Sequence, residues 1–151
     1  VYLYSVPQEK IITKGQYETY YTFSKKQVLC KNNRKLGLID WFGKALLGVK
    51  YDEIQAYGNK QFRVNIKGQW GVVAAGDQII VPLEYDYIAP LKSKMCVVKK
   101  YGKLGIVSLD GKEQVFPKYD KINIKNNKAE AYENGVLTVL TFDENGRNHS
   151  T

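Results

Sequence analysis

The chain has 151 residues, enough for one domain or a short array of repeats, and its 44% hydrophobic content argues against wholesale disorder. No apolar run approaches the roughly 20 residues that a membrane-spanning helix needs. The 23 basic and 15 acidic residues give a formal charge of +8, which attracts anionic partners, although lysines spread along a chain also solubilise a β-rich surface and protect strand edges.

Three sequence markers recur with one period. A Tyr-acid pair occurs every 34 residues, at Tyr17-Glu18, Tyr51-Asp52, Tyr85-Asp86 and Tyr119-Asp120. A large apolar residue followed by glycine has the same spacing, at Leu36-Gly37, Trp70-Gly71 and Leu104-Gly105. An apolar residue three positions after the tyrosine recurs as Ile54, Ile88 and Ile122. Chance would not align three independent markers, so the chain is predicted to be a tandem repeat.

The repeat makes the whole chain, 1–151, a single β-repeat domain. We expect a degenerate copy over 1–32, clear copies over 33–66, 67–99 and 100–133, and a partial capping copy over 134–151. Eroded copies at both ends are typical of terminal units that cap a stack.

The elements predicted within one copy follow the same order each time. A strand such as "QFRVNI" runs into a tight turn at Gly68, Gly102 or Gly135, since glycine adopts positive φ without strain. The next strand, "WGVVAA" or "LGIVSL", is apolar on both faces, which indicates that both faces are covered. A third short strand follows, and Pro82 and Pro117 are expected to end its pairing because proline has no N–H to donate.

Three short strands and a turn per copy, without a helical period, predict an all-β fold. We expect tandem antiparallel β-hairpin or meander repeats of about 34 residues, stacked into a twisted array that buries the apolar face of each copy. The alternative is a closed, barrel- or propeller-like arrangement. The array is favoured because a period of about 34 residues is short for a four-stranded blade.

The recurring residues are interpreted as structural. The large residue of each glycine motif is expected to fill the space between copies, and the glycine to let another backbone or ring approach closely. An exposed Trp70 that stacks on a sugar or base is the alternative, but leucine at the equivalent positions favours burial. Tyr51, Tyr85 and Tyr119 are expected to pack between copies, and the aspartates after them to accept backbone N–H bonds in the turn that follows the third strand. A carbohydrate grip by these Tyr-Asp pairs is the alternative, although their near uniformity is typical of scaffolding.

Cys30 and Cys96 are predicted to be buried free thiols. Each shares its strand face with an apolar neighbour, Val28 or Val98, and a whole repeat lies between them. A disulfide needs Cα atoms within roughly 7 Å, so none is expected.

The sequence contains no recognisable catalytic constellation. Asp40, Asp110 and Asp143 occur one per copy in turns and are interpreted as turn formers, and His149 is the only histidine. One histidine cannot supply a Cys-His, Ser-His-Asp or zinc-binding set. We therefore expect no enzyme activity, no metal site and no cofactor.

The segments "GQWGVVAAGDQIIVPLEYDYI" and "GKLGIVSLDGKEQVFPKYDKI" resemble the bacterial WG-repeat family. That family's unit reads approximately Gly-Lys-Trp-Gly, a hydrophobic strand, a Gly-Lys turn, an apolar strand, proline and Lys-Tyr-Asp. The resemblance covers about 33–122. Leucine replaces tryptophan in two central copies, and Gly48 and Val49 stand in place of one proline motif. The resemblance implies a β-repeat architecture without catalytic residues or a settled ligand, and it slightly favours the bacterial cell envelope or secretion over the cytoplasm.

The function expected of such an array is protein–protein interaction with an acidic partner, because repeats offer a long curved surface and the chain is basic. The alternative is binding to the cell wall or another anionic glycan; nucleic-acid binding is not expected. The glycan alternative predicts an exposed aromatic row, whereas scattered rings favour a protein partner or mere packing. The tyrosines that decide this are Tyr2, Tyr4, Tyr20, Tyr21, Tyr57, Tyr87, Tyr101 and Tyr132.

Overall fold

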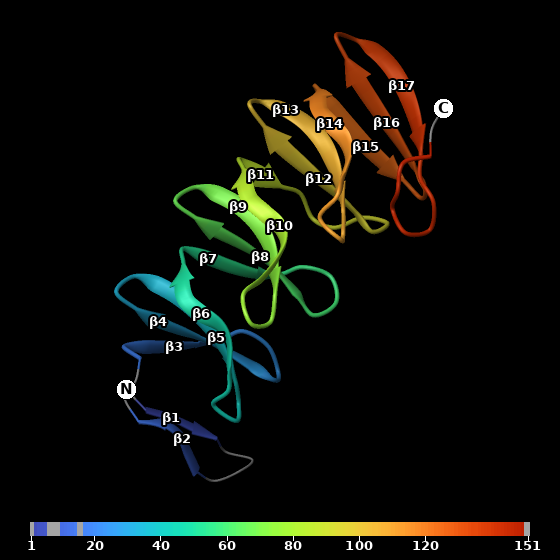
Figure 1. Cartoon of the computed structure of the whole chain (residues 1–151). Coiled ribbons are helices and arrows are strands. Elements are labelled where there is room, and N and C mark those ends of the chain that lie inside the picture. Colours follow the sequence, from blue (N-terminus) through green and yellow to red (C-terminus); the bar gives the residue numbers. More distant parts are fainter. Residues whose placement is uncertain (1, 6–9, 15–16, 150–151) are drawn as a thin grey trace.

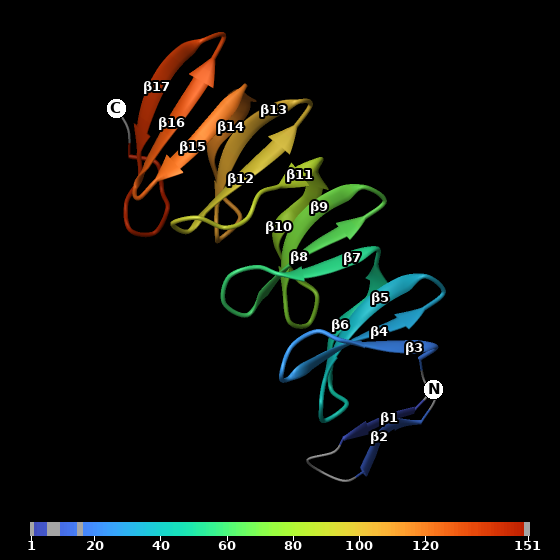
Figure 2. The ribbon, with the colours of Figure 1, turned by 180° about the vertical axis from the view of Figure 1, so that it is seen from behind.

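The computed structural model describes residues 2–5, 10–14 and 17–149, and over these residues the chain is all-β. A two-stranded sheet, β1 (Tyr2–Ser5) and β2 (Lys10–Lys14), precedes three four-stranded sheets and one three-stranded sheet. Figures 1 and 2 show the sheets side by side in an elongated, twisted row, with the C-terminus at the end opposite to β1 and β2. The predicted stacked array of antiparallel repeats is confirmed, and the row is open rather than closed into a barrel or propeller.

Each of the four larger sheets, numbered I to IV here, is an antiparallel meander whose strands pair in chain order. Sheet I consists of β3 (Thr19–Thr22), β4 (Gln27–Asn32), β5 (Lys35–Asp40) and β6 (Ala45–Tyr51). Sheet II consists of β7 (Glu53–Ala56), β8 (Gln61–Ile66), β9 (Gln69–Ala74) and β10 (Gln78–Tyr85). Sheet III consists of β11 (Tyr87–Ile88), β12 (Met95–Lys100), β13 (Lys103–Ser108) and β14 (Glu113–Tyr119). Sheet IV consists of β15 (Lys121–Lys125), β16 (Lys128–Glu133) and β17 (Val136–Thr141).

The expectation of three strands per copy is wrong for sheets I to III, which have four because a short additional strand opens each of them, whereas sheet IV has three. β7 has four residues and β11 has two, so four strands fit within one period of the repeat. The period is therefore not too short for a four-stranded sheet. Each sheet begins directly after a Tyr-acid pair, whereas the predicted copies begin in the tight turn between the second and third strands. The repeat in sequence and the sheet in space have the same period but are out of phase.

Pro82 and Pro117 do not end the pairing of the strand in which they stand. Both lie inside edge strands, β10 and β14, where the register skips and pairing resumes at the tyrosine of the Tyr-acid pair. Proline is tolerated at a bulge in an edge strand because its missing N–H is not needed there. β6 has the same irregularity without a proline, so the bulge belongs to the repeat itself.

Most of the hydrophobic core lies between neighbouring sheets, and a smaller buried cluster of Val28, Cys30 and Ile39 lies within sheet I. The buried cluster between sheets I and II consists of Leu38, Leu47, Tyr51, Ile54, Phe62, Val64 and Val73. Equivalent clusters join sheet II to sheet III and sheet III to sheet IV. Fully burying one such side chain contributes about 1.5–3 kcal/mol, so each sheet depends on its neighbours for stability.

The two cysteines are buried and free, as predicted. Cys30 packs with Val28 and Ile39, whereas Cys96 belongs to the core between sheets II and III. Burial raises the pKa of the Cys96 thiol to about 11, partly offset by hydrogen bonding with Tyr57.

The raised pKa of Cys96 makes stability depend on alkaline pH. The folded state holds this proton more tightly than the unfolded state, so its contribution is complete below the ordinary thiol pKa of about 8.5 and is lost as the pH rises through about 11. We expect the free energy of unfolding to fall by about 3 kcal/mol more over this interval in the natural chain than in the Cys96→Val variant. Valine already occupies the equivalent buried position in sheet I, Val28. Urea unfolding at several pH values measures both slopes, and equal slopes would contradict this expectation.

Candidate functional site

The large residues of the glycine motifs lie at the borders of the inter-sheet cores. Trp70 is half-buried beside the cluster between sheets II and III, Leu36 packs against the cluster between sheets I and II, and Leu104 is also half-buried. The guanidinium of Arg63 lies 5.4 Å from the centroid of the Trp70 ring. The chain itself therefore uses a face of this ring that a sugar or base would need.

The motif glycines let a bulged edge strand lie close to its neighbour. A Cβ at Gly71 would lie 2.6 Å from the carbonyl oxygen of Val81, and one at Gly105 would lie 2.5 Å from that of Val115. Gly37 is crowded in the same way by β6. Any side chain at these positions would push the edge strand away.

The repeated tyrosines, Tyr51, Tyr85 and Tyr119, are buried, with at most 6% of each residue exposed. They end β6, β10 and β14, and each belongs to the cluster shared with the next sheet. The Tyr51 hydroxyl donates a 2.7 Å hydrogen bond to a carboxylate oxygen of Asp77 in sheet II. Burial and this carboxylate hold the pKa of Tyr51 well above its ordinary value. These rings therefore form part of the stacking core.

The aspartates after these tyrosines link consecutive sheets. Asp52 forms an ion pair with Lys35 of sheet I and accepts a 2.7 Å hydrogen bond from the backbone N–H of Lys67 in the central turn of sheet II. Lys35 and this N–H hold the pKa of Asp52 below its usual range. Asp86 and Asp120 accept equivalent bonds from the central turns of sheets III and IV. The predicted acceptor role is thus directed at a turn in the next sheet, and not at the turn after the third strand.

The acidic residues that lie in turns are engaged in local structure. Asp40 and Asp143 each accept two hydrogen bonds from backbone N–H groups of their own turn, and Asp110 binds the Ser108 hydroxyl and Arg147. Within the described residues, no group of three or more His, Cys, Asp or Glu side chains could hold a metal ion. The same part of the chain contains no helix that is long and apolar enough to cross a membrane.

Lysine occupies one equivalent position in all four larger sheets, which the three sequence markers did not reveal. Lys26, Lys60, Lys94 and Lys128 are spaced 34 residues apart and lie where the first strand of each sheet connects to the second. In Figure 1 these connections follow one long edge of the row. All four side chains are exposed, and none has an ion-pair partner among residues 17–149. We call these four residues the lysine row.

Among the described residues, no acidic side chain near the lysine row forms an ion pair with its cations. Lys25 and Lys92 are exposed in the same connections and also lack an ion-pair partner among the described residues. The aspartates in turns of this edge bind backbone N–H groups or neighbouring side chains; they are Asp40, Asp77, Asp110 and Asp143. Aligning the copies and searching for a charged residue at every equivalent position would have found the row from sequence.

The exposed tyrosines do not form a row. Tyr57 is buried, Tyr20 and Tyr132 are half-buried, and the side chains of Tyr2 and Tyr4 lie outside the described part of the structure. The exposed tyrosine rings are Tyr21 in β3, Tyr87 in β11 and Tyr101 in the turn between β12 and β13, at unrelated positions of the repeat. The rings of Phe42 and Phe116 are exposed as well, and they do not share a repeat position with these tyrosines or with each other.

The site is thus a line of cations on one edge of a stack whose recurring aromatic residues are engaged in packing. Comparison of the sequence with protein-family models and with curated proteins finds no match to either.

Proposed function

We propose that the chain is a non-catalytic β-repeat module, of the WG-repeat type that its central copies resemble, which binds an extended acidic segment of another protein along the lysine row. The observation that supports this most directly is a lysine at one equivalent position in four consecutive sheets, exposed and without an ion-pair partner in the described part of the chain. Because this charge repeats with the fold, it forms a line of cations rather than a scattered excess.

The spacing of the lysine row suits an extended chain. Stacked sheets lie about 10 Å apart, and an extended chain advances about 3.3 Å per residue. A segment along the edge would therefore pass one lysine of the row about every three residues. Each exposed ion pair contributes about 0.2–1 kcal/mol, so affinity would come from several weak contacts together and would fall as salt screens them.

An anionic cell-wall glycan is the second candidate, because regularly spaced negative charges on a sugar chain would also match the row. Its binding would be expected to use exposed aromatic rings beside the cations. The exposed rings do not follow the repeat, which favours the protein partner; they are Tyr21, Phe42, Tyr87, Tyr101 and Phe116.

The proposal is tested by replacing all four lysines of the row with glutamine. We expect this variant to bind a fluorescent glutamate-rich peptide at least about tenfold more weakly than the natural chain at low salt, since four exposed ion pairs are lost. Fluorescence anisotropy measures the affinity, and addition of salt is expected to weaken the natural chain more steeply than the variant.

The matched control removes the same charge from the opposite ends of the strands. Lys67, Lys99, Lys118 and Lys121 are exposed and lack ion-pair partners among the described residues. Their replacement by glutamine should weaken peptide binding by less than about threefold. Equal loss of peptide affinity in both variants would show that binding depends on net charge and not on the lysine row. Tighter binding of a sulfated oligosaccharide than of the peptide would favour the glycan.

A further inference from the structure

Two positions of the repeat decide how far the space between one sheet and the next is filled. One position follows the first strand of the sheet, and the other lies in the second strand. In sheet I they hold Phe23 and Leu29, which pack against the core between sheets I and II, and the Phe23 ring lies 6.0 Å from the ring of Phe62. In sheet II the same positions hold Tyr57 and Arg63, and in sheet III they hold Leu91 and Val97.

Between sheets II and III, both residues bridge the gap. The Tyr57 hydroxyl donates a 2.8 Å hydrogen bond to the carbonyl oxygen of Ala89, and the Arg63 guanidinium donates one to the carbonyl oxygen of Ile88. Arg63 also lies over the rings of Tyr57 and Trp70. Aromatic and guanidinium groups thus occupy the space that stacking leaves here.

Between sheets III and IV, neither residue makes the hydrogen bonds that Tyr57 and Arg63 make between sheets II and III. Leu91 turns back toward sheet II, where a Cβ on Gly58 would lie 2.9 Å from its Cδ2, and it packs against the core between sheets II and III. Val97 packs against the core between sheets III and IV but has no hydrogen-bond donor that could replace Arg63. A cavity of about 290 Å³ remains. Its lining is Ala89, Pro90, Lys92, Val97, Ile122, Asn123, Ile124 and Lys125.

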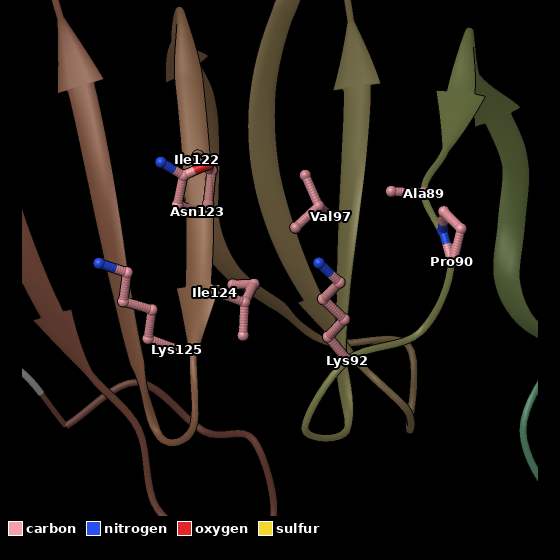
Figure 3. A pocket seen from close by; sticks show the side chains of 8 residues that line it. All are labelled: Ala89, Pro90, Lys92, Val97, Ile122, Asn123, Ile124 and Lys125. Carbon is pink, nitrogen blue, oxygen red and sulfur yellow. The ribbon is translucent and has the colours of Figure 1, made fainter.

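The lining of the cavity combines an apolar surface with two lysines, Lys92 and Lys125, which lie near the lysine row. Figure 3 shows Val97 of β12 and Ile124 of β15 extending into the space between the two strands, with Lys92 rising beside Val97. Lys92 has no ion-pair partner among the described residues, whereas Lys125 is paired with Glu130 at 2.9 Å. Lys92 belongs to the same connection as Lys94 of the row, and Lys125 lies just before the turn that leads to Lys128.

We infer that this cavity is an anchor pocket that receives one apolar side chain of the acidic segment bound along the lysine row. This inference rests on the proposed function and narrows the partner to an acidic sequence with an aliphatic or aromatic residue between its carboxylates. A cavity of about 290 Å³ is at the lower limit for small-molecule sites, which suits one side chain better than a cofactor. Charge complementarity favours the acidic peptide, because carboxylates beside the anchor would meet Lys92, Lys94 and Lys128.

The test compares two glutamate-rich peptides that differ at one central residue, leucine or serine. We expect the leucine peptide to bind the natural chain about tenfold more tightly, because its side chain leaves water on binding. Isothermal titration calorimetry measures both affinities. Equal affinities would overturn the anchor pocket while leaving the lysine row intact, and no binding of either peptide would overturn both.

Variants at Val97 fill the pocket with residues that the repeat already accommodates at this position. Val97→Arg copies Arg63 and Val97→Leu copies Leu29. We expect Val97→Arg to bind the serine peptide at least as well as the natural chain does, because a cation is added, but to lose the preference for leucine. Val97→Leu should reduce the preference to an intermediate value. If the Val97→Arg variant kept the full preference for the leucine peptide, the leucine side chain would have to bind outside this cavity.

A second measurement uses the natural chain and needs no variant to fold. In methyl nuclear magnetic resonance spectra, the leucine peptide is expected to shift the signals of Val97, Ile122 and Ile124 more than the serine peptide does. Leu38 of the distant I/II core serves as the unshifted reference. Equal shifts with both peptides, or equal shifts with a sulfated oligosaccharide that carries no apolar anchor, would contradict the inference.

Discussion

Replacing Gly111 with alanine is expected to lower the free energy of unfolding by about 3–5 kcal/mol. Gly111 lies in the turn between β13 and β14 with φ of +87°, a conformation that costs an alanine about 1–2 kcal/mol. A Cβ there would also overlap the carbonyl oxygen of Ile80 in sheet II, so that sheets II and III would have to move apart. Urea unfolding followed by circular dichroism measures the change.

The matched control is Gly102→Ala. Gly102 has φ of +77° in the turn between β12 and β13, and no heavy atom lies within 4 Å of where its Cβ would be. Only the cost of holding an alanine at positive φ applies, so we expect the free energy of unfolding to fall by about 1–2 kcal/mol. If the two substitutions were equally costly, the close approach of sheets II and III at Gly111 would not contribute to stability.

The stacking of sheets could be predicted because the central strands are apolar on both faces. Alternate residues of a strand point to opposite faces of its sheet. In β9, Val73 belongs to the core shared with sheet I and Val72 to the core shared with sheet III, and both are fully buried. β13 repeats this arrangement with Ile106 and Val107. A strand covered on both faces is the expected signature of a sheet inside a stack.

The phase of the repeat and the first strand of each sheet could not be predicted in the same way. A period is the same wherever counting begins, so it does not show where one sheet ends. β11 has only Tyr87 and Ile88, too few residues for an alternating pattern, and its pairing with β12 depends on tertiary contacts. The prediction that the prolines end strand pairing was wrong for a related reason. Pro82 stands in an edge strand at a bulge, where regular pairing is already interrupted.

The candidate site was partly readable from the sequence and partly not. The lysine row is visible once the copies are aligned, but counting lysines as composition conceals it. The pocket depends on Leu91 turning toward Gly58 and away from sheet IV, which is a side-chain direction that no repeat pattern encodes. The apolar nature of Val97 alone would have indicated core packing.

The lysine row depends physically on the stacking of the sheets. The row is a line only while four sheets keep their order, and contacts at both ends of the strands hold this order. Asp77 joins sheets I and II at the edge of the row. Asp52 joins Lys35 of sheet I to the central turn of sheet II at the opposite end, away from Lys60. Loss of stacking is therefore expected to weaken binding through geometry, without removal of any cation.

Tyr51→Ala is expected to cost about 3–5 kcal/mol of unfolding free energy, because it removes a buried ring from the core between sheets I and II. Tyr51→Phe separates the ring from the hydroxyl, whose 2.7 Å bond to Asp77 joins the two sheets, and should cost about 1–2 kcal/mol. Tyr119 is equally buried at the same repeat position but has no hydroxyl partner among the described residues, so Tyr119→Phe should cost less than about 0.5 kcal/mol. Urea unfolding of the three variants provides the comparison. Equal losses in the two phenylalanine variants would show that the Tyr51–Asp77 bond does not hold sheets I and II together.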